Sequence, residues 1–181
     1  MDTGLFFIGI LLIPTAILLG SWWWSRTHHN TELESTADTL EQNAYDGYIN
    51  RITGLLLERN LAASNEDDEI RTIARAQTAD VLRNVNAVRK GRIVGFLYDS
   101  SLLNVGAPVV NLRMLDLAEA DLSRFNLSEA SFQGAQLTQA ELSEANLSLS
   151  DLRAAELSGA NLKNVILTGA YLRGANLQNT D

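Results

Sequence analysis

Residues 140–157, AELSEANLSLSDLRAAEL, repeat a small residue, a polar residue and leucine once every five residues. The spacing continues in both directions, because Leu or Phe recurs at every fifth position from Leu112 to Leu177 without an insertion. An α-helix, with about 3.6 residues per turn, would scatter these leucines around all of its sides, and a flat strand would alternate them between two faces. The spacing therefore predicts a repeat architecture.

Over residues 110–179 the chain resembles the pentapeptide repeat family, whose pattern is A-(D/N)-L-x-x. The resemblance implies a mainly β solenoid, a right-handed quadrilateral β-helix with four pentapeptides per coil. In that fold the central residue and the small residue two positions before it point inward. We therefore expect a β-helix of about 3.5 coils over residues 104–181. The family as a whole implies no enzymatic activity and no cofactor.

If residues 20 apart stack in such coils, the sequence also predicts the surface. Arg113, Arg153 and Arg173 follow the central residue on one face and are expected to form a basic ladder. The next two faces carry mainly acids, and Arg124 and Lys163 are the bases among them. The acids are Asp116, Glu119, Glu156, Asp121, Glu141 and Glu144. The alternative is that exposed positions of a ladder accept any polar residue.

Three apolar residues occupy positions that should point outward: Leu149, Ile166 and Tyr171. On the coil map they converge on one edge, and contiguous exposed apolar groups mark contact sites more often than scattered ones do. An open edge of the last coil could also pair with another chain. We expect the partner to be a membrane protein complex or a second copy, bound through the edge of the β-helix or its C-terminal coil.

Residues 1–25 are predicted to form a single transmembrane helix. From Leu5 to Trp24 the chain has 20 residues without a charge, enough to cross the hydrocarbon core of a bilayer. Membrane helices tolerate a proline such as Pro14, and an aromatic belt at the interface is expected from Trp22, Trp23 and Trp24. A cleaved signal peptide is the alternative, but its basic start and small-residue cleavage site are missing. Arg26 follows the span, so by the positive-inside rule the rest of the chain is expected in the cytoplasm. The membrane is expected to be the thylakoid or plasma membrane of a bacterium.

Between the predicted span and the repeats lie a polar linker or helical extension, residues 26–42, and a helical connector, residues 43–103. The connector is similar to the helical segment before the repeats in membrane-anchored bacterial members of the family, many of them cyanobacterial. Its last helix is expected at about residues 87–98. A basic cluster could touch anionic lipid headgroups, although a solvated helix face is the favoured interpretation; its members are Arg83, Arg89, Lys90 and Arg92.

The composition limits the possible chemistry. The chain has no Cys, which excludes disulfides and thiolate metal sites. The adjacent His28 and His29 cannot easily converge on one metal ion, so we expect no metal site. With 22 acids against 14 bases, the net charge of −8 argues against general binding of nucleic acid.

These features predict a non-catalytic, membrane-anchored scaffold or adapter, an accessory or assembly subunit of a membrane protein complex, with photosynthetic complexes as one candidate. The alternative is a DNA mimic that occupies the DNA site of a topoisomerase, as some acidic members of the family do. An enzyme is least favoured, because the outward Asp, Glu and Ser residues recur as surface positions and do not converge with a histidine or a phosphate-binding loop.

Overall fold

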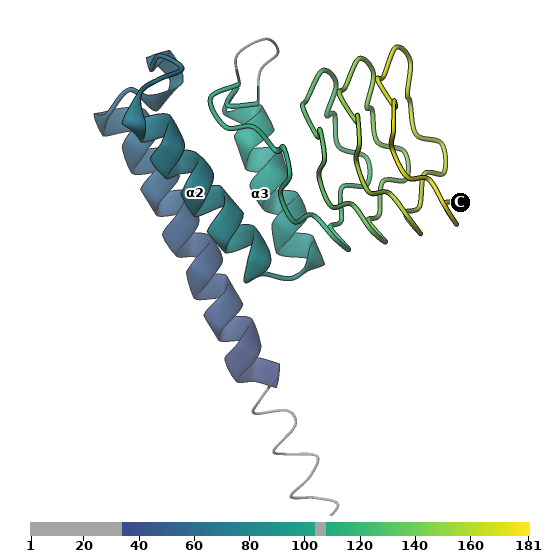
Figure 1. Ribbon diagram of the computed structural model, residues 1–181. Coiled ribbons are helices and arrows are strands. Elements are labelled where there is room, and N and C mark those ends of the chain that lie inside the picture. The colour runs from purple at the N-terminus through teal and green to yellow at the C-terminus, as the bar shows by residue number, and fades with distance from the viewer. Residues whose placement is uncertain (1–33, 104–107) are drawn as a thin grey trace, which may run out of the picture. The chain divides into compact units, whose positions relative to one another are not determined.

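The computed structural model describes residues 34–103 and 108–181 (Figure 1). The chain divides into two units, Met1–Leu40 and Glu41–Asp181. Residues 34–58 are helical, and the second unit continues with η1 (Leu61–Ala63), α2 (Glu69–Arg83) and α3 (Ala87–Asp99). The second unit ends in stacked coils formed by residues 111–181, which we call the coil stack.

Parallel backbone pairing between residues 20 apart holds the coil stack together. Asp116 pairs with Gln136, and Asp121 pairs with Glu141. The Leu117 N–H donates to the Gln136 carbonyl at 2.8 Å, and the Gln136 N–H donates to the Leu115 carbonyl at 3.0 Å. The paired residues recur every five positions, so each coil has four sides and contributes one paired residue on each side.

The predicted fold class, a mainly β solenoid with a transmembrane helix, is wrong for the part of the chain that the structure describes. The coil stack there contains isolated β-bridges and no β-strand. The reason is that residues with a left-handed backbone, such as Glu119 (φ 61°) and Glu144 (φ 60°), turn the chain once in every repeat. Each side is thereby limited to one paired residue, whereas a strand usually has at least about three.

No helix in residues 34–103 or 108–181 has the length and apolar character needed to cross a bilayer. The predicted span over residues 1–25 lies outside the described residues, and so do His28 and His29. The same is true of the residues named as its membrane anchor, which are Leu5, Pro14, Trp22, Trp23 and Trp24.

The interior of the coil stack is filled by the positions that the sequence repeats. The central residues are buried from Leu112 to Leu157, including Phe132, which replaces leucine in one repeat. Most small residues two positions earlier are buried as well: Ala120, Ala130, Ala135, Ala140, Ala145, Ala155 and Ala160. In the last repeats Leu162, Leu167 and Leu172 are only partly buried, and Leu177 is exposed.

The helices of the second unit bury a separate group of residues at their contacts. Tyr48, Ile52 and Leu82 are fully buried, and the Tyr48 hydroxyl forms a hydrogen bond of 2.9 Å with Thr78 Oγ1 on α2. Burial raises the pKa of Tyr48 above its ordinary value, because the phenolate would lose its hydration. This contact fixes α2 against helical residues 41–58.

Helix α3 lies between α2 and the coil stack and covers the first coil (Figure 1). Its extent, Ala87–Asp99, confirms the helix expected at about 87–98. A Cβ atom added at Gly91 would overlap the Asp121 carbonyl oxygen, and one added at Gly95 would overlap the ring of Phe125. These two glycines, one turn apart, therefore allow the helix backbone to approach the coil closely.

Phe125 is the matching feature on the coil stack. It occupies the position two before Leu127, where most repeats have alanine. Phe125 is partly buried, and its ring lies against Gly91 and Gly95 of α3. The Asp121 N–H also donates to the Ala87 carbonyl at 3.1 Å, which joins the start of α3 to the coil edge.

Candidate protein-interaction surface

The three outward apolar residues expected from the sequence are exposed. Leu149 is 53%, Ile166 49% and Tyr171 60% exposed. Leu149 is at a corner between two sides of a coil, with φ 61°, and its side chain covers Gly169 in the next coil. Large apolar side chains at such positions do not contribute to the interior of the stack, which leaves them available for contact.

Leu149 and Tyr171 border a cleft of about 690 Å³. One part of the lining comes from α2 and from Glu66 in the turn before it, another from the chain that enters the first coil, and the third from the coil stack. The complete lining is Glu66, Arg71, Thr72, Arg75, Pro108, Val109, Asn111, Arg113, Glu129, Ser131, Leu149, Asp151, Arg153 and Tyr171. The structure thus brings two of the three apolar residues to the cleft, whereas Ile166 is not part of its lining.

The predicted arginine ladder is divided in the same way. Arg113 and Arg153 line the cleft, and Arg173 does not. Arg153 forms a bidentate ion pair with Asp151, with Nε–Oδ1 and Nη2–Oδ2 distances of 2.8 and 2.7 Å. This ion pair holds the pKa of Asp151 below its usual value. Arg153 is therefore largely neutralised, and Arg113 is the residue of the ladder whose charge faces the cleft.

Several of the acids on the other sides of the coil stack are also partnered. Asn161 Nδ2 donates to Glu141 at 2.9 Å, and Asn176 donates to Glu156 at 2.8 Å, each between stacked coils. Hydrogen bonds from Ser143 and Asn161 lower the pKa of Glu141, and those from Ser158 and Asn176 lower the pKa of Glu156. Arg124 pairs with Glu144 at 3.2 Å. The polar positions thus form hydrogen-bonded ladders from one coil to the next.

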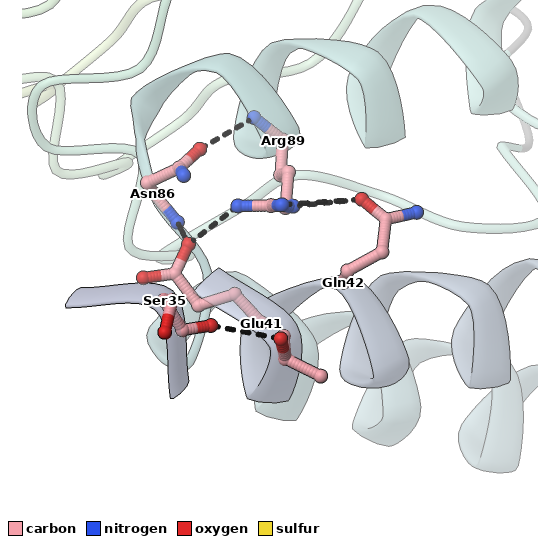
Figure 2. Close-up of polar contacts among 6 residues, drawn as sticks. Ser35, Glu41, Gln42, Asn86 and Arg89 are labelled. Carbon is pink, nitrogen blue, oxygen red and sulfur yellow. Dashed lines mark hydrogen bonds and ion pairs between the residues drawn. The ribbon is translucent and has the colours of Figure 1, made fainter. Parts of the chain in front are cut away.

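Arg89, from the predicted basic cluster, is bound within the protein. It is 8% exposed, and its guanidinium donates to Glu41 Oε2 at 2.9 Å and to Gln42 Oε1 at 3.1 Å (Figure 2). Glu41 Oε2 also accepts the Asn86 N–H, and the Asn86 side chain caps α3 by accepting the Arg89 N–H at 3.1 Å. The guanidinium of Arg89 thus links residues 41–42 to the start of α3.

Lys90 is occupied in a similar way. It is 8% exposed, and its Nζ contacts Asp116 Oδ1 at 3.3 Å and the Ala118 carbonyl at 2.9 Å, both in the first coil. Arg83 and Arg92 are exposed, and Arg83 forms an ion pair of 3.6 Å with Asp80. Contact with lipid headgroups therefore stays a prediction, in which Arg83 and Arg92 are the members of the cluster that reach the surface.

Arg71 and Arg75 of α2 line the cleft, although neither was expected from the sequence to be a site residue. Arg71 donates to Ser64, and Arg75 Nη2 donates to the Arg113 carbonyl at 3.4 Å. No spacing in the sequence connects α2 with the repeats, because the cleft forms only when the helices pack against the coil stack. Within residues 34–103 and 108–181 no three His, Cys, Asp or Glu side chains are grouped so that they could hold a metal ion.

The comparisons with known proteins concern the repeats. The family model for pentapeptide repeats matches residues 116–153 and 150–181, in 8 copies. No curated protein gave a significant match.

Three solved structures are similar over part of their length. A pentapeptide repeat protein from the cyanobacterium Cyanothece is 38% identical over 40% of this chain and 46% of its own, with a TM-score of 0.34. HetL from the cyanobacterium Nostoc, involved in the regulation of heterocyst differentiation, is 30% identical over 44% and 41%, with a TM-score of 0.32. A pentapeptide repeat protein from the thylakoid lumen of Arabidopsis thaliana is 33% identical over 39% and 53%, with a TM-score of 0.27. This chain thus spans about half, or less, of the length of each.

Proposed function

Residues 116–181 of this chain belong to the pentapeptide repeat family, and from this premise we propose that the chain is a non-catalytic scaffold that binds a protein partner through its coil stack. Stacked coils of this kind provide a rigid surface whose side chains recur at fixed intervals. Such a surface is suited to binding another protein.

One observation carries the proposal: Leu149 and Tyr171 are large, apolar and more than half exposed beside a cleft. The repeat does not require them, because polar or small residues occupy the corresponding positions in most other coils. The burial of such apolar surface contributes about 25 cal/mol of free energy per Å². It is the main favourable contribution in most protein associations. A partner that covers both side chains would gain this contribution.

Co-migration of the full chain with a partner tests the proposal. Native membranes are solubilised gently, and the apparent mass of the protein is measured by native electrophoresis. We expect a complex larger than one chain that is lost in Leu149→Asp and in Tyr171→Asp. The matched control is Gln139→Asp, because residue 139 lies at the opposite corner of the coil and has a similar backbone conformation (φ 57° against 61° at Leu149). Migration of the wild-type chain at the mass of a monomer would contradict the proposal.

We further propose that the scaffold works at a bacterial membrane as an accessory subunit of a membrane protein complex, for which photosynthetic complexes are candidates. The support is in the sequence: residues 5–24 carry no charge and are predominantly apolar. If this segment attaches the chain to the bilayer, Leu11→Asp with Leu18→Asp should move the protein to the soluble fraction, because each charge is costly in hydrocarbon.

The absence of Cys allows the orientation to be tested without a background signal. A single cysteine in Thr138→Cys reports the side of the membrane that the coil stack occupies. If the coil stack is cytoplasmic, a membrane-impermeant maleimide should label this cysteine only after the cells are permeabilised. Labelling of intact cells would place the coil stack on the outer side.

A further inference from the structure

The first coil leaves one side of the coil stack without its backbone pairing. On three sides the ladders begin in the first coil, at Asp116, Asp121 and Asn126. On the fourth side the ladder begins one coil later, with Ser131 and Asp151. Among the described residues no bridge joins Asn111 to Ser131, and no acceptor is found for the Ser131 N–H.

The cause is the path of the chain before the first coil. The Val110 N–H donates to the Leu102 carbonyl at 2.9 Å, which draws this segment toward the end of α3. Regular pairing resumes at Met114, whose N–H donates to the Gln133 carbonyl at 3.1 Å. Ser131 consequently presents an open backbone edge, and it lies in the wall of the cleft.

Two arginines bring positive charge to this open edge. Arg75 and Arg113 line the cleft, and neither forms an ion pair with any residue that the structure describes. The whole lining has four Arg and three acids, so that its local charge is +1 in a chain of net charge −8. Guanidinium groups bind carboxylates through two parallel hydrogen bonds.

A buried polar atom points to the same place. Asn111 Oδ1 is shielded from solvent and has no hydrogen-bond partner in the described structure. A buried acceptor without a partner is unfavourable by about 1–3 kcal/mol, so native structures seldom leave one without a donor. Asn111 belongs to the lining of the cleft, beside the edge that lacks its pairing. Because this oxygen is shielded from solvent, it marks the interrupted pairing at Asn111 and is not itself a contact for a ligand.

The apolar wall makes the cleft different from a simple anion site. Leu149 and Tyr171 share the lining with the α2 residues, and Val109 adds a further apolar side chain. A ligand that satisfies both walls needs a negative group beside an apolar side chain. Nucleic acid fits poorly, because its backbone would bring repeated negative charge against Glu66, Glu129 and Asp151.

We infer that the cleft binds an extended acidic segment of the protein partner, with a carboxylate on Arg113 and Arg75, an apolar side chain against Leu149 and Tyr171, and backbone hydrogen bonds to the edge at Ser131. This inference rests on the proposed scaffold function and specifies the chemistry of the partner. Adding a strand to an open edge is a common way of recognising a peptide: the edge provides hydrogen bonds and the side-chain contacts provide specificity.

Selection from a library of random decapeptides tests this inference with the full-length protein in detergent. The wild-type protein should enrich peptides that place Asp or Glu next to an aromatic or aliphatic residue. Arg113→Glu should abolish the enrichment in acidic residues, and Arg113→Gln should weaken binding of the selected peptides by about tenfold. Arg173→Glu is the matched control, because Arg173 belongs to the same ladder but lies outside the lining.

In the selection itself, three results would overturn the inference: no enrichment above background, enrichment without acidic residues, or the same enrichment with Arg113→Glu as with the wild type. Thermal unfolding of each variant shows that it has folded. Succinate, inorganic phosphate and single-stranded DNA are tested as competitors of the best peptide. If any of them competes at the concentration of the peptide itself, the cleft is an anion site and not a peptide site.

The outcome can be separated from that of the proposed function. If Tyr171→Asp releases the partner from native membranes and Arg113→Glu does not, the scaffold function stands and the acidic segment is rejected. If neither variant changes the migration of the protein, the proposed function itself is contradicted.

Discussion

The coil stack and the helices that precede it form their interiors by different means. The coil stack repeats one arrangement, with a central Leu or Phe and a small residue turned inward, and among its described residues no charged side chain is buried. The helical part instead buries Arg89 and Lys90, both 8% exposed, in contacts with distant residues. Local spacing thus determines the coil stack, whereas particular pairs of residues hold the helices to each other and to the first coil.

The largest expected effect breaks the repeated core. Leu142 is 1% exposed in the middle of the coil stack, and Leu142→Ala should reduce the free energy of unfolding by about 3 kcal/mol, because it removes a buried side chain and leaves a cavity. Leu172→Ala, at a partly buried position in the last coil, is the control and should cost clearly less. Urea unfolding followed by circular dichroism measures both; equal losses would contradict the difference in burial.

A methyl group at Gly91 should weaken the contact between the helices and the coil stack. Its Cβ would overlap the backbone of Asp121, which cannot move aside easily, so Gly91→Ala should cost about 2–3 kcal/mol and weaken the contact of α3 with the first coil. Gly54→Ala is the matched control, since Gly54 is also helical and no atom lies within 4 Å of its added Cβ. The control should be neutral or more stable than the wild type by up to about 1 kcal/mol. Hydrogen exchange of the amides of α3 locates the effect.

Ion pairs inside the helical part should contribute more to the free energy of unfolding than those on the coil stack. Arg89→Met removes the donor to Gln42 Oε1 and leaves Glu41 with the Asn86 N–H alone, so it should cost about 2 kcal/mol. Arg124→Gln removes a pair with Glu144 in which both side chains are more than half exposed, and it should cost less than about 0.5 kcal/mol. Urea unfolding of both variants measures the difference, and losses of equal size would remove this contrast between the regions.

The smallest expected effect concerns pH and the ladders of the coil stack. The pKa values of Glu141, Asp151 and Glu156 are lowered in the folded state by their hydrogen bonds. The carboxylates therefore contribute stability that is complete above their ordinary pKa values of about 4 and is lost as the pH falls through the lowered values. The urea midpoint should be nearly constant from about pH 7 to pH 5 and fall below about pH 4. In Asp151→Asn the fall should be shallower; an unchanged slope would contradict the contribution of the Asp151–Arg153 pair.

The sequence could predict what depends on spacing alone. The interval of five residues carries the resemblance to the pentapeptide repeat family, and that resemblance implied the inward positions, the four-sided coils and hence the exposure of Leu149 and Tyr171. The absence of strands among the described residues was not predicted, because the family pattern does not reveal that a left-handed residue follows every paired residue so closely.

Contacts between distant segments could not be predicted from that spacing. The cleft combines Arg71 and Arg75 of α2 with Arg113 of the first coil, and only the packing of helices on the coil stack brings them together. One signal was available: Phe125 interrupts the row of small residues, and Gly91 and Gly95 lie one helical turn apart. A large residue at a small-residue position and two spaced glycines indicate a helix that packs on that coil.

Photo-crosslinking from the coil stack tests the central claim, that this surface binds a protein partner, most directly. A benzoylphenylalanine residue is introduced in cells in place of Leu149, and separately in place of Gln139 at the opposite corner of the coil. We expect irradiation to give one discrete adduct, larger than a single chain, from position 149 and none from position 139. Equal adducts from both positions, or none from position 149, would contradict the claim.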